Sequence, residues 1–163
     1  MSLRNYRPVM TSNYTLDWLN AFKLKDIHAM RVSKLGNKVT MLQTASYVNQ
    51  SMSEVMHGNA AIWGVKENKT GYFVGILALQ NVDLQGRSAR ISASFVDGNE
   101  QKNILREIVV HVIKMLRTDL KLNSLFVAEN AVADFMPVLA ELNFERVEYS
   151  EEPTLAKFML FVR

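Results

Sequence analysis

The stretch 87-RSARISASFV-96, followed by 97-DGNEQKN-103 and 104-ILREIVVHVIKML-116, decides which fold the chain is expected to adopt. Its first part alternates between apolar and polar residues, which is the pattern of a strand with one buried face. Its last part has apolar residues at steps of three and four, which predicts an amphipathic helix packed on a sheet. The apolar positions are Ala89, Ile91, Ala93 and Phe95 in the strand, and Leu105, Ile108, Val109, Val112, Ile113 and Leu116 in the helix.

The polar residues 97–103 predict a loop between this strand and this helix. Such a connection leaves the first backbone N–H groups of the helix without partners, near the positive end of the helix dipole. Those groups can bind an anion, most often a phosphate. Many α/β connections share this geometry and bind nothing, so the order of the other elements is needed to support a phosphate site.

Length and composition predict a single domain spanning residues 1–163. Hydrophobic residues make up 48% of the chain and charged residues 21%, the balance of an ordinary globular protein without a membrane segment. The absence of cysteine excludes disulfides, thiolate metal sites and a cysteine nucleophile. His28, His57 and His111 lack the spacing of a metal motif, and the net charge of +3 is dispersed, so neither a metal nor a nucleic acid is expected.

The segment before residue 87 predicts a strand, two helices and a hairpin. The first strand is expected over 5–10, at an edge because of Pro8, and the hairpin strands over 60–65 and 72–79. Apolar spacing predicts helices over 14–30 and 39–56, with a loop at 32–38. The expected buried stripe of the second helix is Leu42, Ala45, Val48, Met52 and Met56.

The segment after residue 116 predicts a strand over 122–128, a short helix over 133–142 and two final strands over 144–149 and 156–162. The helix tolerates Pro137 only in its first turn, because proline lacks the N–H that an interior turn requires. The complete order is β-α-α-β-β-β-α-β-α-β-β.

This order resembles that of the GCN5-related N-acetyltransferases (GNAT), and in particular the branch that acetylates the N-terminal amines of ribosomal proteins. The likeness spans almost the whole chain. It implies an α/β (α+β) fold with a mixed, mostly antiparallel sheet that is flanked by helices and splays where its fourth and fifth strands part. The local matches are 7-RPV-9 in the opening strand, 61-AIWGVK-66 with 73-FVGIL-77 in the central hairpin, and 139-LAELNF-144 at the last helix.

In this family acetyl-CoA hydrogen-bonds to the backbone of the fourth strand, which implies Ser94, Phe95 and Val96 here. Its pyrophosphate binds amides of an Arg/Gln-x-x-Gly-x-Gly/Ala loop, which falls on residues 100–105 if Glu107 matches the glutamate that often follows. Asn130 resembles the asparagine that family members have after the fifth strand. The further cofactor-binding residues that the resemblance implies are Gln101, Lys102, Asn103, Ile104 and Leu105.

The chain departs from the family's loop at three positions. Glu100 replaces a basic or amide residue, Asn103 replaces the first glycine, and Leu105 replaces the second small residue. Glycine allows the backbone to approach a phosphate closely, and asparagine tolerates similar backbone angles better than most residues. Glu100 adds negative charge beside a diphosphate, which Lys102 offsets if it points into the same site.

The acid and base of the reaction stay unassigned. The carboxylate that family members often place on the fourth strand corresponds to Arg90 here, and the tyrosine of their last helix falls near Leu139. The resemblance implies acetyl transfer to a primary amine, on a protein N-terminus or a small molecule, in the cytoplasm. The apolar final strand could pair across a homodimer. The alternative is a catalytically impaired member of the fold that serves as a binding or interaction module.

Overall fold

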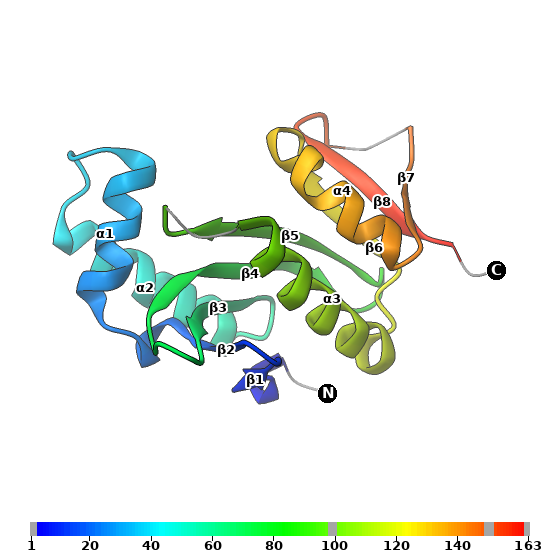
Figure 1. The fold of residues 1–163 in the computed structure, drawn as a ribbon. Helices are drawn as coiled ribbons and strands as arrows, with labels where there is room; N and C mark the ends of the chain where they lie inside the picture. The colour runs from blue at the N-terminus through cyan, green and yellow to red at the C-terminus, as the bar shows by residue number, and fades with distance from the viewer. Residues whose placement is uncertain (1–2, 98–100, 149–151, 162–163) are drawn as a thin grey trace. The chain divides into compact units, whose positions relative to one another are not determined.

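The computed structural model describes residues 3–97, 101–148 and 152–161, which fall into two compact units (Figure 1). The amino-terminal unit contains 3–78 and 93–97, and the carboxyl-terminal unit contains 79–92, 101–148 and 152–161. Strands β4 (Phe73–Asp83) and β5 (Ser88–Phe95) contribute residues to both units. The prediction of a single domain is not tested by this division and stays a prediction.

The amino-terminal unit is a sheet with the strand order β1-β2-β3-β4-β5 and two helices. β1 (Val9–Met10) pairs antiparallel with β2 (Tyr14–Trp18), and β2 pairs antiparallel with β3 (Ala61–Glu67). The helices are α1 (Leu24–Leu35) and α2 (Met41–Met56). The predicted edge position of the first strand is therefore confirmed, although only its last two residues are extended.

The helix predicted over residues 14–30 is wrong in its first part, where the chain forms β2. Leu16 and Trp18 are buried while Thr15 and Asp17 are less so, which is the period-2 pattern of a strand. The pairing with β3 stacks Trp18 on Trp63, with ring centroids 5.8 Å apart. Tertiary pairing thus overrides a three-residue apolar spacing that also suits a helix.

The remaining helical boundaries of this unit shift for local reasons. α1 continues to Leu35 through much of the predicted loop and ends at Gly36, whose φ of +98° favours glycine. α2 begins after Thr40, whose Oγ1 accepts a hydrogen bond from the Gln43 N–H while the Gln43 side chain accepts one from the Thr40 N–H. This capping box fixes the start of the helix.

The predicted buried stripe of α2 is wrong at its two ends, while Val48 is buried and Ala45 and Met52 are half-buried. Leu42 is 78% exposed and Met56 is 59% exposed, whereas the polar Thr44 is fully buried. Thr44 can be buried because its hydroxyl lies 2.9 Å from Nδ1 of His28 on α1. The face of α2 that is buried therefore differs from the face that carries the apolar stripe. The buried residues are Thr44, Val48, Ser51 and Val55.

The carboxyl-terminal unit has the strand order β4-β5-β6-β8-β7 and two helices. β6 (Ser124–Ala128) runs parallel to β5, and β8 (Leu155–Leu160) runs antiparallel to both β6 and β7 (Phe144–Arg146). The helices are α3 (Gln101–Leu120) and α4 (Val132–Glu141). The final strand thus pairs on both sides, so the prediction that it is open to pairing across a homodimer is wrong, and the edge strand is β7.

Two helix predictions in this unit are corrected. Residues 101–103, predicted as loop, belong to α3, since glutamine and lysine favour helix; residues 98–100 lie outside the described residues. Pro137 lies inside α4 rather than in its first turn. The helix tolerates it because Val132, Phe135, Val138 and Leu139 bury one face, which outweighs one lost backbone hydrogen bond.

Among the described residues no helix combines the length and the apolar character that crossing a bilayer requires.

We expect Gly75→Ala to lower the free energy of unfolding by about 1–3 kcal/mol, because the added methyl group would overlap backbone atoms that cannot move without distorting the sheet. A Cβ at Gly75 on β4 would lie 2.5 Å from the carbonyl oxygen of Ser94 and 2.6 Å from the ring of Phe95. Urea unfolding measures the difference. The control is Gly86→Ala, where the near atom is a carboxylate oxygen of the exposed Asp83 side chain. Equal losses in the two variants would contradict the close approach at Gly75.

Candidate functional site

The predicted residues Ser94, Phe95 and Val96 lie at the end of β5, in the amino-terminal unit. Phe95 is 5% exposed, Ser94 is exposed, and Val96 donates its backbone N–H to the carbonyl of Val74 on β4 at 2.9 Å. Gly75 has no side chain where β4 passes this strand end. The alternation seen in the sequence therefore sets which side chains are buried, and Gly75 sets how closely the two strands approach.

Val96 also lines a cavity of about 890 Å³ in the amino-terminal unit. This volume lies within the range of roughly 300–1,000 Å³ that is usual for small-molecule sites. Its wall comes from β2, the chain leading into α1, α1 itself, the β3–β4 turn and the end of β5. The lining includes Thr15, Asp17, Phe22, Lys23, Lys25, Asp26, Ser33, Lys66, Glu67, Tyr72, Val74, Val96 and Asp97.

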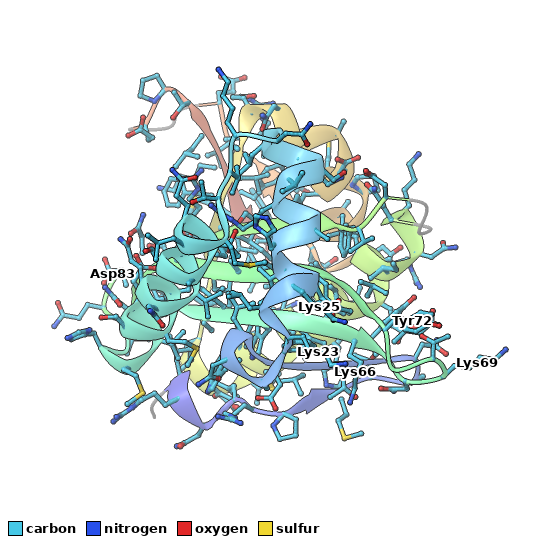
Figure 2. All side chains as sticks on the ribbon, turned by 90° about the vertical axis from the view of Figure 1, so that its left-hand side faces the viewer. Lys23, Lys25, Lys66, Lys69, Tyr72 and Asp83 are labelled. Carbon is cyan, nitrogen blue, oxygen red and sulfur yellow. The ribbon has the colours of Figure 1, made fainter. Side chains whose placement is uncertain are left out.

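The cavity wall carries charges of both signs, with the carboxylates of Asp17, Asp26, Glu67 and Asp97 beside three lysines. Lys23, Lys25 and Lys66 form no ion pair within the part of the chain that the structure describes. Figure 2 shows these three lysines gathered beside the start of α1, with Tyr72 and Lys69 further along the same side. The lysines could contact an anionic group of a ligand, and the carboxylates a cationic one.

Asp97, a second acidic residue of the cavity wall, ties α1 to the end of β5. It accepts hydrogen bonds from the Ser33 hydroxyl and from Nζ of Lys34, the latter at 2.9 Å. Both interactions, with the Ser33 hydrogen bond the larger, hold the pKa of the Asp97 carboxyl below its ordinary value of 3.8. The carboxylate therefore stays charged at neutral pH and fixes the rim of the cavity.

The loop residues that the sequence predicted lie in the first turns of α3, in the carboxyl-terminal unit. Gln101, Lys102 and Asn103 are exposed. Ile104 and Leu105 are 2% and 4% exposed and belong to the core of that unit. Leu105 is therefore a packing residue of the helix, and replacing it with glycine would unpack the core rather than open a loop.

Asn130 lies in a short 3-10 turn, Glu129–Ala131, directly after β6, and its side chain is exposed. β6 itself pairs with β5 through Ser88–Ser124, Ala89–Leu125 and Arg90–Phe126. The parallel ladder ends there, although β5 and β6 both continue beyond it. Within the carboxyl-terminal unit the two strands therefore part after Arg90.

No cluster of three or more His, Asp or Glu side chains suited to a metal ion occurs in residues 3–97, 101–148 and 152–161. The three histidines have local explanations. His28 contacts Thr44, Nδ1 of His57 lies 2.7 Å from the carbonyl of Ser53, and His111 lies exposed on α3. None lines the cavity beside Val96.

Solved acetyltransferase structures share this architecture along nearly the whole chain. A Vibrio cholerae protein assigned as a ribosomal-protein-serine acetyltransferase matches 99% of this chain and 100% of its own, with a TM-score of 0.76 at 16% identity. The chain has the GNAT fold. A Salmonella typhimurium acetyl transferase that modifies the N-terminal serine of a 50S ribosomal subunit protein has this fold at a TM-score of 0.72. It is 10% identical, over 94% of this chain and 97% of its own.

The GNAT fold also recurs in the microcin C7 self-immunity acetyltransferase, solved in complex with acetyl-CoA and AMP. That structure is 12% identical, covers 93% of this chain and 94% of its own, and has a TM-score of 0.69. At the level of sequence, no family model and no curated protein matches the chain. The fold expected from the order of elements is thus confirmed by structure, and identities this low establish the fold alone.

Sequence reasoning missed the lysines around the cavity of this GNAT fold. Lys23 and Lys25 are close in sequence, but Lys66 comes from the end of β3 and approaches them only through the β2–β3 pairing. Since β2 was predicted as helix, no pattern in the sequence placed these charges together. A strand prediction at Tyr14–Trp18 would have been the signal.

We expect Asp97→Asn to lower the melting temperature at neutral pH, because the amide accepts more weakly from Ser33 and Lys34 than the carboxylate does. The pKa of Asp97 is lowered in the folded state, so its contribution is complete above about pH 4 and is lost as the pH falls through that lowered pKa. The difference from the wild type should therefore shrink in acid. Ser33→Ala should show part of the same pH dependence. A difference that does not change with pH would contradict this role for Asp97.

Proposed function

We propose that the protein transfers an acetyl group from acetyl-CoA to a primary amine, on a protein N-terminus or a small molecule. The observation that carries the proposal is the early end of the β5–β6 ladder in a chain with the GNAT fold. Parallel strands that part leave N–H and C=O groups on their facing edges unpaired, and such groups can bind an extended ligand as a further strand would. Pantetheine, with its two amide groups, suits that role.

The solved neighbours support acetyl-CoA as the co-substrate. The microcin C7 self-immunity acetyltransferase was solved with acetyl-CoA, and a ribosomal L7/L12 α-N-protein acetyltransferase was solved with coenzyme A. Other neighbours are named for a ribosomal protein and for spermidine, which share an amine as the acceptor. This range of acceptors is why the proposal stops at a primary amine.

In the proposed reaction the amine nitrogen forms a bond to the acetyl carbonyl carbon, the C–S bond breaks, and one proton passes from nitrogen to the departing sulfur. A backbone N–H near Phe95 would polarise the thioester carbonyl. Positioning of the two substrates supplies the rest, because neither a general acid nor a general base is assigned.

The diphosphate of acetyl-CoA would bind the first turn of α3, where Gln101, Lys102 and Asn103 are exposed. Backbone N–H groups and the positive end of the dipole favour an anion there, and the Lys102 ammonium adds a mobile charge. The buried Leu105 does not crowd this surface, since its side chain packs into the core. Of the loop departures that could be placed, Leu105 is therefore less harmful to phosphate binding than the sequence suggested.

A second candidate function is a binding module that has kept the fold and lost turnover. The observation that favours it is Arg90 on β5, at the position that corresponds to a carboxylate in many family members. An arginine cannot act as the general base, because it stays protonated at all ordinary pH values. We further propose a cytoplasmic location and, as the route to any homodimer, the edge strand β7.

We expect the wild type to bind acetyl-CoA with micromolar affinity in a calorimetric titration, and Lys102→Glu to weaken binding about tenfold by reversing a charge beside the diphosphate. Lys114→Glu is the matched control, because Lys114 is an exposed lysine on the same helix, beyond its first turns. It should bind acetyl-CoA as the wild type does.

Equal weakening by the two charge reversals would contradict a diphosphate site at the start of α3. Absence of binding by the wild type would overturn the proposed co-substrate. Binding without any acetylated product, measured by mass spectrometry over a panel of peptide and small amines, would favour the binding module.

A further inference from the structure

Arg90 on β5, in the carboxyl-terminal unit, has no partner for its guanidinium among the residues that the structure describes. Arg90 is half-buried and its Nε is shielded from solvent, yet that atom has no hydrogen-bond partner. Within the part of the chain that the structure describes, the guanidinium also forms no ion pair. Shielding a cation from water without pairing it costs stability, so such a group calls for an explanation beyond packing.

Two other arginines show how this chain usually compensates a half-buried guanidinium. Arg31 also has a shielded Nε without a hydrogen bond, but its Cζ lies 4.3 Å from the centre of the Tyr47 ring. Arg117 donates from Nη1 to the carbonyl of Leu142 at 2.9 Å. A cation over an aromatic face and a hydrogen bond to a carbonyl are both stabilising. Arg90 has neither arrangement.

Arg90 lines a cavity of about 220 Å³. This is the space of about seven water molecules, which suits a group the size of an amino acid. The other lining residues are Asn81, Ser88, Phe126, Glu152 and Leu155, all in the carboxyl-terminal unit. The wall thus combines one guanidinium, one carboxylate, an amide, a hydroxyl and two apolar side chains.

The strand register aligns the cavity with a cationic row. Arg90 on β5 is the register partner of Phe126 on β6, and Phe126 is the partner of Lys157 on β8. Paired residues on neighbouring strands project from the same face of a sheet. Nζ of Lys157 lies 5.7 Å from the centre of the Phe126 ring. The Phe126 ring therefore lies on the same face of the sheet as two basic residues.

We propose that this cavity binds a carboxylate of the acceptor substrate, with Arg90 as the residue that recognises it. Guanidinium and carboxylate match in a planar pair of hydrogen bonds, which would satisfy the shielded Nε. The same wall also holds the Glu152 carboxylate, so the cavity favours a ligand that carries both an ammonium and a carboxylate over a polyanion such as a phosphate.

The proposal rests on the proposed acetyl transfer, and it names the class of acceptor: an amine that also bears a carboxylate. Two sources share that chemistry. One is an acidic side chain at the start of a peptide, and the other is the α-carboxylate of a free amino acid. Arg90 would be a specificity-determining residue in either case. It would replace the family's carboxylate with a group that holds the acceptor rather than one that takes its proton.

The test compares matched acceptors by their kcat/KM values. The peptide arm uses Glu-Ala-Ala and Gln-Ala-Ala amides, and the amino-acid arm uses glycine and glycinamide. We expect the wild type to prefer the carboxylate-bearing member of one pair about tenfold or more. Arg90→Gln should reduce that preference to about one, and Arg90→Lys should keep part of it, because lysine retains the charge without the planar fork.

The control is Arg117→Gln, which removes a half-buried guanidinium that has a partner. It should lower the melting temperature, because the Leu142 carbonyl loses its hydrogen bond, and leave the preference unchanged. Arg90→Gln should not lower the melting temperature of the free protein, because it removes an uncompensated charge. A purely structural role for Arg90 would give the opposite sign.

A binding measurement separates this site from turnover. Calorimetric titration with γ-aminobutyrate, against γ-aminobutyramide, should show binding of γ-aminobutyrate that Arg90→Gln abolishes. If no amine is acetylated but γ-aminobutyrate binds through Arg90, the carboxylate site stands and the proposed function fails. If Arg90→Gln keeps both the acceptor preference and the γ-aminobutyrate binding, or if the wild type has neither, the carboxylate site is overturned whatever the acetylation assay shows.

Discussion

The short parallel ladder between β5 and β6 is the constraint on which the rest of the structure depends. The two strands are held through Ser88, Ala89 and Arg90 on one side and Ser124, Leu125 and Phe126 on the other, and then part. A parallel pair needs a crossover connection, and α3 with its fully buried Ile108, Val109 and Val112 supplies it. The early end of pairing leaves backbone groups of both edges for something other than a strand.

Each of the two units contains ion pairs in which a basic and an acidic side chain compensate each other. Asp17 pairs with Arg7, Asp97 with Lys34, Arg106 with Glu141 and Arg146 with Glu129. Exposed pairs of this kind contribute little stability. The informative groups are the uncompensated ones, namely the lysines around the larger cavity and the guanidinium of Arg90. Both occur beside a cavity, which is where a ligand can supply the missing charge.

The fold class could be predicted because two independent signals agreed in the segment that carries it. The alternation from Ser88 to Phe95 and the helical spacing from Ile104 to Leu116 each repeat several times. The period of each pattern is therefore unambiguous. The predictions failed where the apolar pattern was short or supported two periods at once. Leu16 is three residues from Leu19, which suits a helix, and two residues from Trp18, which suits a strand. Only the pairing of this segment with β3 decides between the two.

The sequence by itself determined the central strand and helix, the hairpin before them and the order of elements, because each depends on local periodicity and turn chemistry. Tertiary structure decided which charges meet. Lys66 approaches Lys23 only through a sheet register, and Arg90 becomes an anomaly only when its Nε is seen shielded and unpartnered. Shielding and pairing are relations between residues far apart in the chain, and no local pattern encodes them.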